Sequence, residues 1–197
     1  TGVEDEEPAQ GATTPPADPT PELTAEQVQA KAQIEAWLAA PVANPGEVFP
    51  RCGAQAVLDD GSTPLVLDPP FQGQGTAIAE DGTFQTTITM RTRDGQYVIG
   101  NAAGSGATLV LMKEGIVVGY QWLDAEDLTF VDLQPEQTLE IPLRGNRILC
   151  GTGEGGTGSA LPLPRDTYQA VAVVDVMLKE VGTPGGSAES VTRTVTV

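Results

Sequence analysis

The residues that could do chemistry are few, because the chain of 197 residues has two cysteines and no histidine. The lack of histidine excludes Ser-His-Asp and Cys-His catalysis and the usual zinc sites. Cys52 and Cys150 lie beside polar, glycine-containing turns, and we expect them to form a disulfide that leaves no thiol nucleophile. The bridge would close a loop of about 100 residues, worth about 4–5 kcal/mol in the chain-entropy model. The alternative is two unrelated reduced thiols.

Carboxylates are the remaining candidate ligands, and calcium is the metal that hard oxygen ligands favour. Asp59 and Asp60 share one acidic turn, and Asp124 and Asp127 share another. Neither turn has the spacing of an EF-hand loop, so exposed acidic turns without a metal are the expected reading. A glycosidase carboxylate pair is allowed by the residue types. Aromatic residues make up only 5% of the chain, however, and sugar clefts usually need aromatic platforms. We therefore predict no catalytic residue and no cofactor, with calcium as the weak exception.

Three glycines, Gly151, Gly153 and Gly156, match the G-x-G-x-x-G pattern. A dinucleotide site requires a helix directly after these glycines, so that the helix N-terminus meets the pyrophosphate. The proline-containing run 159–164 follows instead and does not start a helix. We predict that residues 151–164 form an exposed loop.

The N-terminal part of the chain divides into a stalk and a helix. Residues 1–22 are acidic and rich in proline, which predicts a disordered stalk. Thr24 and Gln27 have the spacing of a capping box, and Pro41 would end a helix within residues 23–40. The helix has an apolar stripe that includes Leu23, Ala30, Ile34, Trp37 and Leu38. Because a helix this short is marginal alone, we expect it to cap the rest of the domain; binding a partner is the alternative.

Residues 46–197 read as short strands separated by turns. Thr83–Thr92 alternates between apolar and polar residues, and Glu114-Gly115 would turn a tight hairpin. A second hairpin is expected around Asp59-Asp60-Gly61-Ser62, between strands 54–58 and 64–67. Tyr168–Leu178 is the longest apolar strand, and Val191–Val197 closes the chain. Eight or nine strands at intervals of about ten residues predict an antiparallel β-sandwich; the alternative is two small β domains divided near residue 100.

Two turns carry a family resemblance. Leu163-Pro164-Arg165-Asp166-Thr167-Tyr168 resembles the "Leu-Pro-x-Gly-x-Tyr" turn before the penultimate strand of immunoglobulin-like domains, with Asp166 in place of glycine. Leu133-Gln134-Pro135-Glu136-Gln137 resembles their "L-x-P-G-E" turn. Residues 83–197 are thus similar to bacterial immunoglobulin-like domains of the bacillar intracellular proteinase inhibitor type, and to domains of exported actinobacterial lipoproteins. The resemblance implies a mainly β protein: an immunoglobulin-like antiparallel β-sandwich with one short N-terminal helix. It also implies that Leu163 and Tyr168 form a structural turn, in which the Tyr168 hydroxyl makes a hydrogen bond back to the turn.

Charge and composition indicate where the protein acts. A net charge of −17 disfavours nucleic acid and anionic membranes, and no apolar run is long enough to span a bilayer. The richness in Ala, Gly, Pro and Thr, together with more Arg than Lys, is typical of high-GC Gram-positive bacteria. We expect an extracellular monomer held to the cell envelope through a lipidated cysteine upstream of Thr1.

The expected function is a non-enzymatic binding or structural module whose ligand is a protein or a component of the cell envelope. The resemblance supplies one alternative, a proteinase inhibitor acting through the loop 151–164. A carboxylate-based hydrolase is the second alternative.

Overall fold

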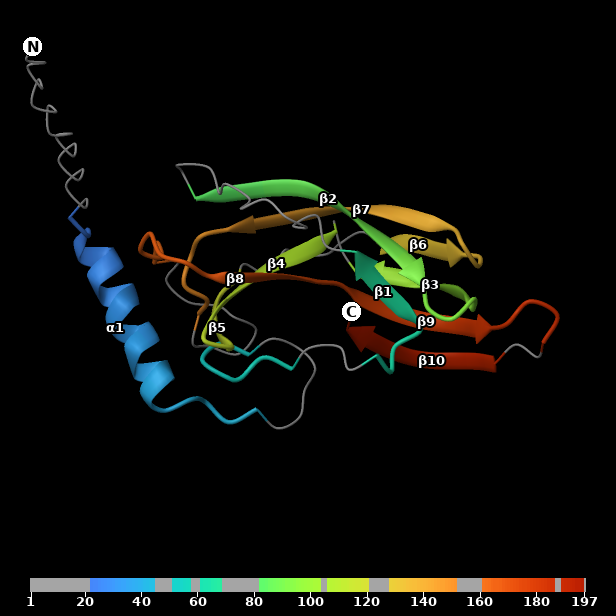
Figure 1. The fold of residues 1–197 in the computed structure, drawn as a ribbon, viewed down its shortest axis with the longest axis horizontal. Coiled ribbons are helices and arrows are strands. Elements are labelled where there is room, and N and C mark those ends of the chain that lie inside the picture. Colours follow the sequence, from blue (N-terminus) through green and yellow to red (C-terminus); the bar gives the residue numbers. More distant parts are fainter. Residues whose placement is uncertain are drawn as a thin grey trace, which may run out of the picture.

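The computed structural model describes residues 22–44, 51–57, 61–68, 82–103, 106–120, 128–151, 161–186 and 189–196. In this part of the chain the protein is mainly β, with one helix and ten strands in two sheets (Figure 1). The prediction of a mainly β protein with one short N-terminal helix is confirmed. The predicted stalk lies outside the described residues except for Glu22.

The two sheets form a β-sandwich-like arrangement. The first has the order β1-β2-β7-β4-β5 with β8 paired to β4: β1 (Leu65–Asp68), β2 (Thr83–Thr92), β7 (Thr138–Asn146), β4 (Ala107–Lys113), β5 (Ile116–Gly119) and β8 (Gln169–Val173). The second has the order β10-β9-β3-β6: β10 (Glu189–Thr196), β9 (Asp175–Gly182), β3 (Tyr97–Ala103) and β6 (Leu128–Leu133). Because β2 pairs with β7, and β3 with both β6 and β9, strand pairing crosses the suggested division near residue 100.

The sequence predicts purely antiparallel sheets, and this prediction is wrong for one pair of strands. β4 and β7 pair in parallel, through Ala107 with Leu143 and Thr108 with Arg144. These strands are separated in the chain by β5 and β6, so no hairpin forces opposite directions on them. The other strand pairs described are antiparallel.

Apolar side chains from both sheets form a single core. In β2 the predicted alternation is observed, since Phe84, Ile88 and Met90 are buried while Gln85 and Arg91 are exposed. The most deeply buried large residues of the core come from both layers and include Leu65, Ile88, Met90, Leu109, Leu143, Val98, Leu133 and Leu178.

Helix α1 (Ala25–Ala39) packs at one end of the strands (Figure 1). Its capping box is formed as predicted. The backbone amide of Gln27 donates to Thr24 Oγ1 over 3.2 Å, and the backbone amide of Thr24 donates to Gln27 Oε1 over 3.0 Å. Ile34 and Trp37 are buried in the same core as the sheets, and α1 contacts β5. The apolar stripe therefore docks on the β region.

The predicted hairpin around residues 59–62 is wrong. β1 pairs with β2, whereas Ala54 bridges Val42 and Gln55 bridges Ile116. The segment before the turn is held elsewhere, because the Gly53 amide donates to the Val117 carbonyl and the Val117 amide donates to the Ala54 carbonyl. A turn signal specifies a local reversal but not the partner of each flanking strand.

The predicted single strand Tyr168–Leu178 is two strands. β8 pairs with β4 in the first sheet, and β9 pairs with β3 and β10 in the second. The break falls at Val174, which is only 2% exposed. The run stays apolar across the break because the chain passes through the core as it changes sheets.

Candidate functional site

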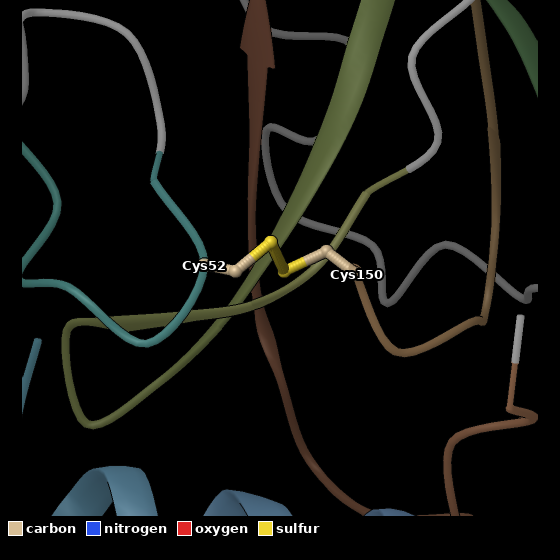
Figure 2. Close-up of a disulfide and its surroundings, with 2 residues drawn as sticks. All are labelled: Cys52 and Cys150. Atoms are coloured by element: carbon tan, nitrogen blue, oxygen red, sulfur yellow. A yellow bond between two sulfur atoms is a disulfide. The ribbon is translucent and has the colours of Figure 1, made fainter. Parts of the chain in front are cut away.

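Cys52 and Cys150 form the predicted disulfide, with their Cα atoms 5.9 Å apart. Figure 2 shows the bridge joining the segment around residue 52 to the segment that follows β7. Backbone bonds hold both ends against β5, since Gly53 donates to Val117 and Cys150 donates to Val118. Both thiols of the chain are thus used in a buried cross-link, and neither is free to act as a nucleophile.

The turn at residues 163–168 is organised around Tyr168. The Tyr168 hydroxyl donates to the Pro164 carbonyl over 3.0 Å, which is the bond expected of such a turn, and Leu163 is fully buried. Asp166 accepts from the Thr167 backbone amide over 2.7 Å and from Lys113 Nζ over 2.8 Å. Lys113 also donates to the Thr167 carbonyl and lies 5.9 Å from the centre of the Tyr168 ring. Asp166 therefore clamps the turn to β4.

The prediction of one exposed loop over residues 151–164 is wrong for its last four residues. Pro162 bridges Ile148, the Leu149 amide donates to the Leu161 carbonyl, and the Leu163 amide donates to the Arg147 carbonyl. Residues 161–164 pair with residues 147–149, after the end of β7. This pairing buries Leu163 fully and Leu161 partly. Residues 152–160, with Gly153 and Gly156, lie outside the described residues.

A cleft of about 360 Å³ separates α1 from the Pro164–Tyr168 turn. Three segments line it: α1 with the preceding Leu23, the end of β4 and the turn itself. The lining residues are Leu23, Lys31, Ile34, Glu35, Leu38, Lys113, Pro164, Arg165, Asp166 and Tyr168. Because these residues come from three segments far apart in the chain, no spacing in the sequence indicates the cleft.

The cleft reverses the charge balance of the molecule. The whole chain has 10 basic and 27 acidic residues, whereas the cleft has three basic residues, Lys31, Lys113 and Arg165, and two acidic ones, Glu35 and Asp166. Lys31 and Glu35 are 3.9 Å apart and mostly exposed, which makes a weak pair. Lys113 and Asp166 make a closer and less exposed pair.

Two ionisable groups of the cleft, Asp166 and Tyr168, have shifted pKa values. The hydrogen bond from Lys113 is the main cause that lowers the pKa of Asp166, helped by the Thr167 amide and the charge of Lys31. Burial raises the pKa of Tyr168 to about 12, with a further contribution from the charge of Asp166. Asp166 is thus anionic and Tyr168 neutral, far from the pKa near 7 that suits proton transfer.

The four calcium candidates are not among the residues that the structure describes. Asp59 and Asp60 fall in the gap at 58–60, and Asp124 and Asp127 fall in the gap at 121–127. Within the described ranges, no three Asp, Glu or Cys side chains come close enough together to hold a metal ion.

Sequence reasoning missed an exposed apolar face on the second sheet. Tyr97 on β3 is not part of this face, because its hydroxyl donates to Glu180 over 2.7 Å and the residue is half-buried. Instead, Leu128 and Phe130 on β6 are 61% and 59% exposed. The signal was present, because these two residues alternate out of phase with the buried Val131 and Leu133 on the same strand.

In the part of the chain described here, no helix has the length and apolar character needed to cross a bilayer. Comparison of the chain with protein-family models, with curated proteins and with solved structures gives no match.

Proposed function

We propose that this chain is a non-enzymatic binding module that acts outside the cell and holds its ligand between α1 and the Pro164–Tyr168 turn. The observation that supports the proposal is the cleft itself. Ligand sites are typically concave and largely apolar, with a few polar groups that orient the ligand. Here Ile34, Leu38 and Tyr168 supply the apolar lining, while Lys31, Lys113 and Arg165 supply convergent charge. The fixed protonation states of Asp166 and Tyr168 favour binding over proton transfer.

The disulfide supports an extracellular location. Such bonds persist mainly in oxidising compartments and are rare in the cytosol. The Cys52–Cys150 bridge is buried and connects segments 98 residues apart, which is typical of a structural cross-link. The acidic, proline-rich residues 1–22 suit a stalk that would hold the module away from a cell surface.

We further propose an immunoglobulin-like core. In the immunoglobulin fold, strands A, B and E share one sheet, and strands C, F and G share the other. The order β1-β2-β7 fits the first set, and the order β10-β9-β3 fits the second, with β6 beside β3. The Tyr168–Pro164 bond before the penultimate strand is a further similarity. Strands β4, β5 and β8, together with α1, would then be additions to the core, and the cleft lies among these additions.

A ligand screen by NMR tests the binding function. A library of small neutral, cationic and anionic molecules would be added to ¹⁵N-labelled protein. We expect hits to shift the backbone amides of α1 and of residues 165–168. Hits confined to the β6 face around Phe130, or no hits at all, would contradict the proposed site. Incubating each hit with the protein and checking its mass tests the non-enzymatic part, because chemical conversion of a hit would refute it.

A matched pair of variants, one just before α1 and one within it, tests whether the ligand occupies the cleft. Leu23→Trp adds bulk to a residue that lines the cleft, whereas Val28→Trp adds the same group to an exposed position that does not line it. We expect only Leu23→Trp to weaken the binding of a hit. Equal effects from the two variants would place the ligand elsewhere.

A further inference from the structure

We infer that the cleft selects small organic anions, namely molecules with one apolar body and one carboxylate or sulfonate group. This inference rests on the proposed binding function and adds the chemical class of the ligand.

Two of the three basic side chains are not needed to hold the fold together. Lys113 is committed, because it bonds to Asp166 and to the Thr167 carbonyl and so clamps β4 to the turn. Lys31 faces Glu35 at 3.9 Å with both side chains more than half exposed, a geometry that contributes little to stability. Arg165 is exposed and makes no hydrogen bond or ion pair within the described residues. Lys31 and Arg165 are therefore available to a ligand.

The charges around the cleft favour an anion over a cation. Asp166, the less exposed of the two cleft carboxylates, already accepts hydrogen bonds from Lys113 and Thr167, and the charge of Lys31 also acts on it. A bound cation would meet three basic side chains and compete with Lys113 for Asp166. A bound anion would instead meet Lys31 and Arg165 and leave the Lys113–Asp166 clamp intact.

The lining and the size limit the rest of the ligand. Ile34, Leu38 and Pro164 give an apolar floor, and the Tyr168 hydroxyl is occupied by the Pro164 carbonyl. The volume of about 360 Å³ lies near the lower end of the range for small-molecule sites. A ring system or a short acyl chain fits this space, and an anionic group at the rim would reach Lys31 and Arg165.

Two fluorescent probes separate charge from apolar contact. 1-Anilinonaphthalene-8-sulfonate carries a sulfonate, and N-phenyl-1-naphthylamine has the same aromatic body without it. We expect the sulfonate probe to bind one site per chain at least about tenfold more tightly than the neutral probe. Raising NaCl from about 0.02 to about 0.3 M should weaken the binding of the sulfonate probe and not that of the neutral probe, because salt screens exposed charges.

Matched double variants locate the effect. Lys31→Gln with Arg165→Gln should weaken the sulfonate probe about tenfold and leave the neutral probe unchanged. Lys179→Gln with Arg144→Gln removes the same charge from exposed positions outside the cleft lining and should change neither probe.

The possible failures are distinguishable. Equal affinity for the two probes, with amide shifts at the cleft, would refute the anion preference and leave the binding function standing. Equal effects from the two double variants would mean that net charge alone attracts the probe, and this too would overturn the inference. No saturable binding of either probe, or shifts centred on Phe130, would overturn both the ligand class and the site.

Discussion

Glu136 has a backbone conformation that glycine adopts more readily. Its φ is +67° and it follows Pro135. The backbone amide of Gln137 donates to the backbone carbonyl of Gln134 over 3.1 Å. These features are typical of a type II turn, in which the residue after proline is left-handed. The "L-x-P-G-E" turn that this segment resembles has glycine at the same place.

We expect Glu136→Gly to raise the free energy of unfolding by about 0.5–1 kcal/mol. The left-handed conformation costs a non-glycine residue about 1–2 kcal/mol, and glycine removes this cost. Glycine also gives the unfolded chain more freedom, which offsets about 0.5–1 kcal/mol of the gain. Urea denaturation measures the change. Glu140→Gly in β7 is the control and should destabilise, since glycine weakens a strand. A loss of stability in both variants would contradict the assignment of strain to Glu136.

The Tyr168 hydroxyl is a second single-residue test. Tyr168→Phe removes the bond to the buried Pro164 carbonyl, and we expect a loss of about 0.5–1.5 kcal/mol in the free energy of unfolding. Tyr97→Phe, which removes a bond to Glu180 on the other sheet, serves as the comparison. If Tyr168→Phe left the stability unchanged, the bond would have no net value.

Tyr168 also gives stability a dependence on alkaline pH. Its pKa is raised to about 12 in the folded protein, against about 10 in an unfolded chain. The folded state therefore favours the neutral phenol, and this contribution is fully present below about pH 10 and is lost as the pH rises towards 12. We expect the wild type to lose more stability than Tyr168→Phe between about pH 9 and about pH 11, in urea denaturation at each pH. Equal losses would refute the assignment, because the raised pKa values of Tyr97 and Tyr120 affect both proteins alike.

At the scale of elements, the docking of α1 depends on Gly53. Its φ is +75°, and a Cβ built at this position would lie 2.5 Å from Trp37 Cδ1 and Nε1. Gly95 has a similar φ of +66° but no atom within 4 Å of its Cβ position. The two glycines thus have the same backbone constraint, and only Gly53 also has a contact with the helix.

We expect Gly53→Ala to cost about 1–3 kcal/mol more than Gly95→Ala, because the added methyl group must displace the Trp37 ring. Urea denaturation gives the difference, and a red shift in tryptophan fluorescence in Gly53→Ala would report exposure of Trp37. Equal costs for the two variants would mean that α1 does not rest on Gly53.

The sequence predicts the elements better than their pairing. The alternation over Thr83–Thr92 places β2 correctly, and Glu114-Gly115 turns the β4–β5 hairpin as expected. Asp94 and Gly95 both have positive φ, as in a hairpin turn, yet the strands they join, β2 and β3, lie in different sheets. Alternation and turn residues are local, whereas the choice of partner depends on how the whole chain buries its apolar faces.

The candidate cleft shows the same division. The turn that ends at Tyr168 could be predicted because its residues are contiguous, and so could the helix that begins after Thr24. Their meeting beside Lys113 could not be predicted, because it depends on β8 pairing with β4 and on α1 docking on β5.

At the scale of the molecule, the disulfide is the strongest single constraint. Its ends are 98 residues apart, and a cross-link of this span stabilises by about 4–5 kcal/mol, mainly by restricting the unfolded chain. We expect Cys52→Ser with Cys150→Ser to lose this amount in urea denaturation. Reducing agent should destabilise the wild type by a similar amount and leave the double variant unchanged. A variant within about 1 kcal/mol of the wild type would show that the bridge contributes little.

The bridge also determines how the molecule would respond to pulling. If tension were applied to the two ends of the chain, α1, β8 and β9 would first transmit load to the strands that they contact. Once these segments had detached, the load would pass from Cys52 to Cys150 through the sulfur atoms and not through the backbone of β1 to β7. The 98-residue separation corresponds to roughly 320–350 Å of extended chain. This length cannot add to the extension of the oxidised protein and becomes extensible on reduction. If the module is held at a cell surface, as proposed above, the bridge would limit its extension under shear, because only the segments outside residues 52–150 could then be pulled straight.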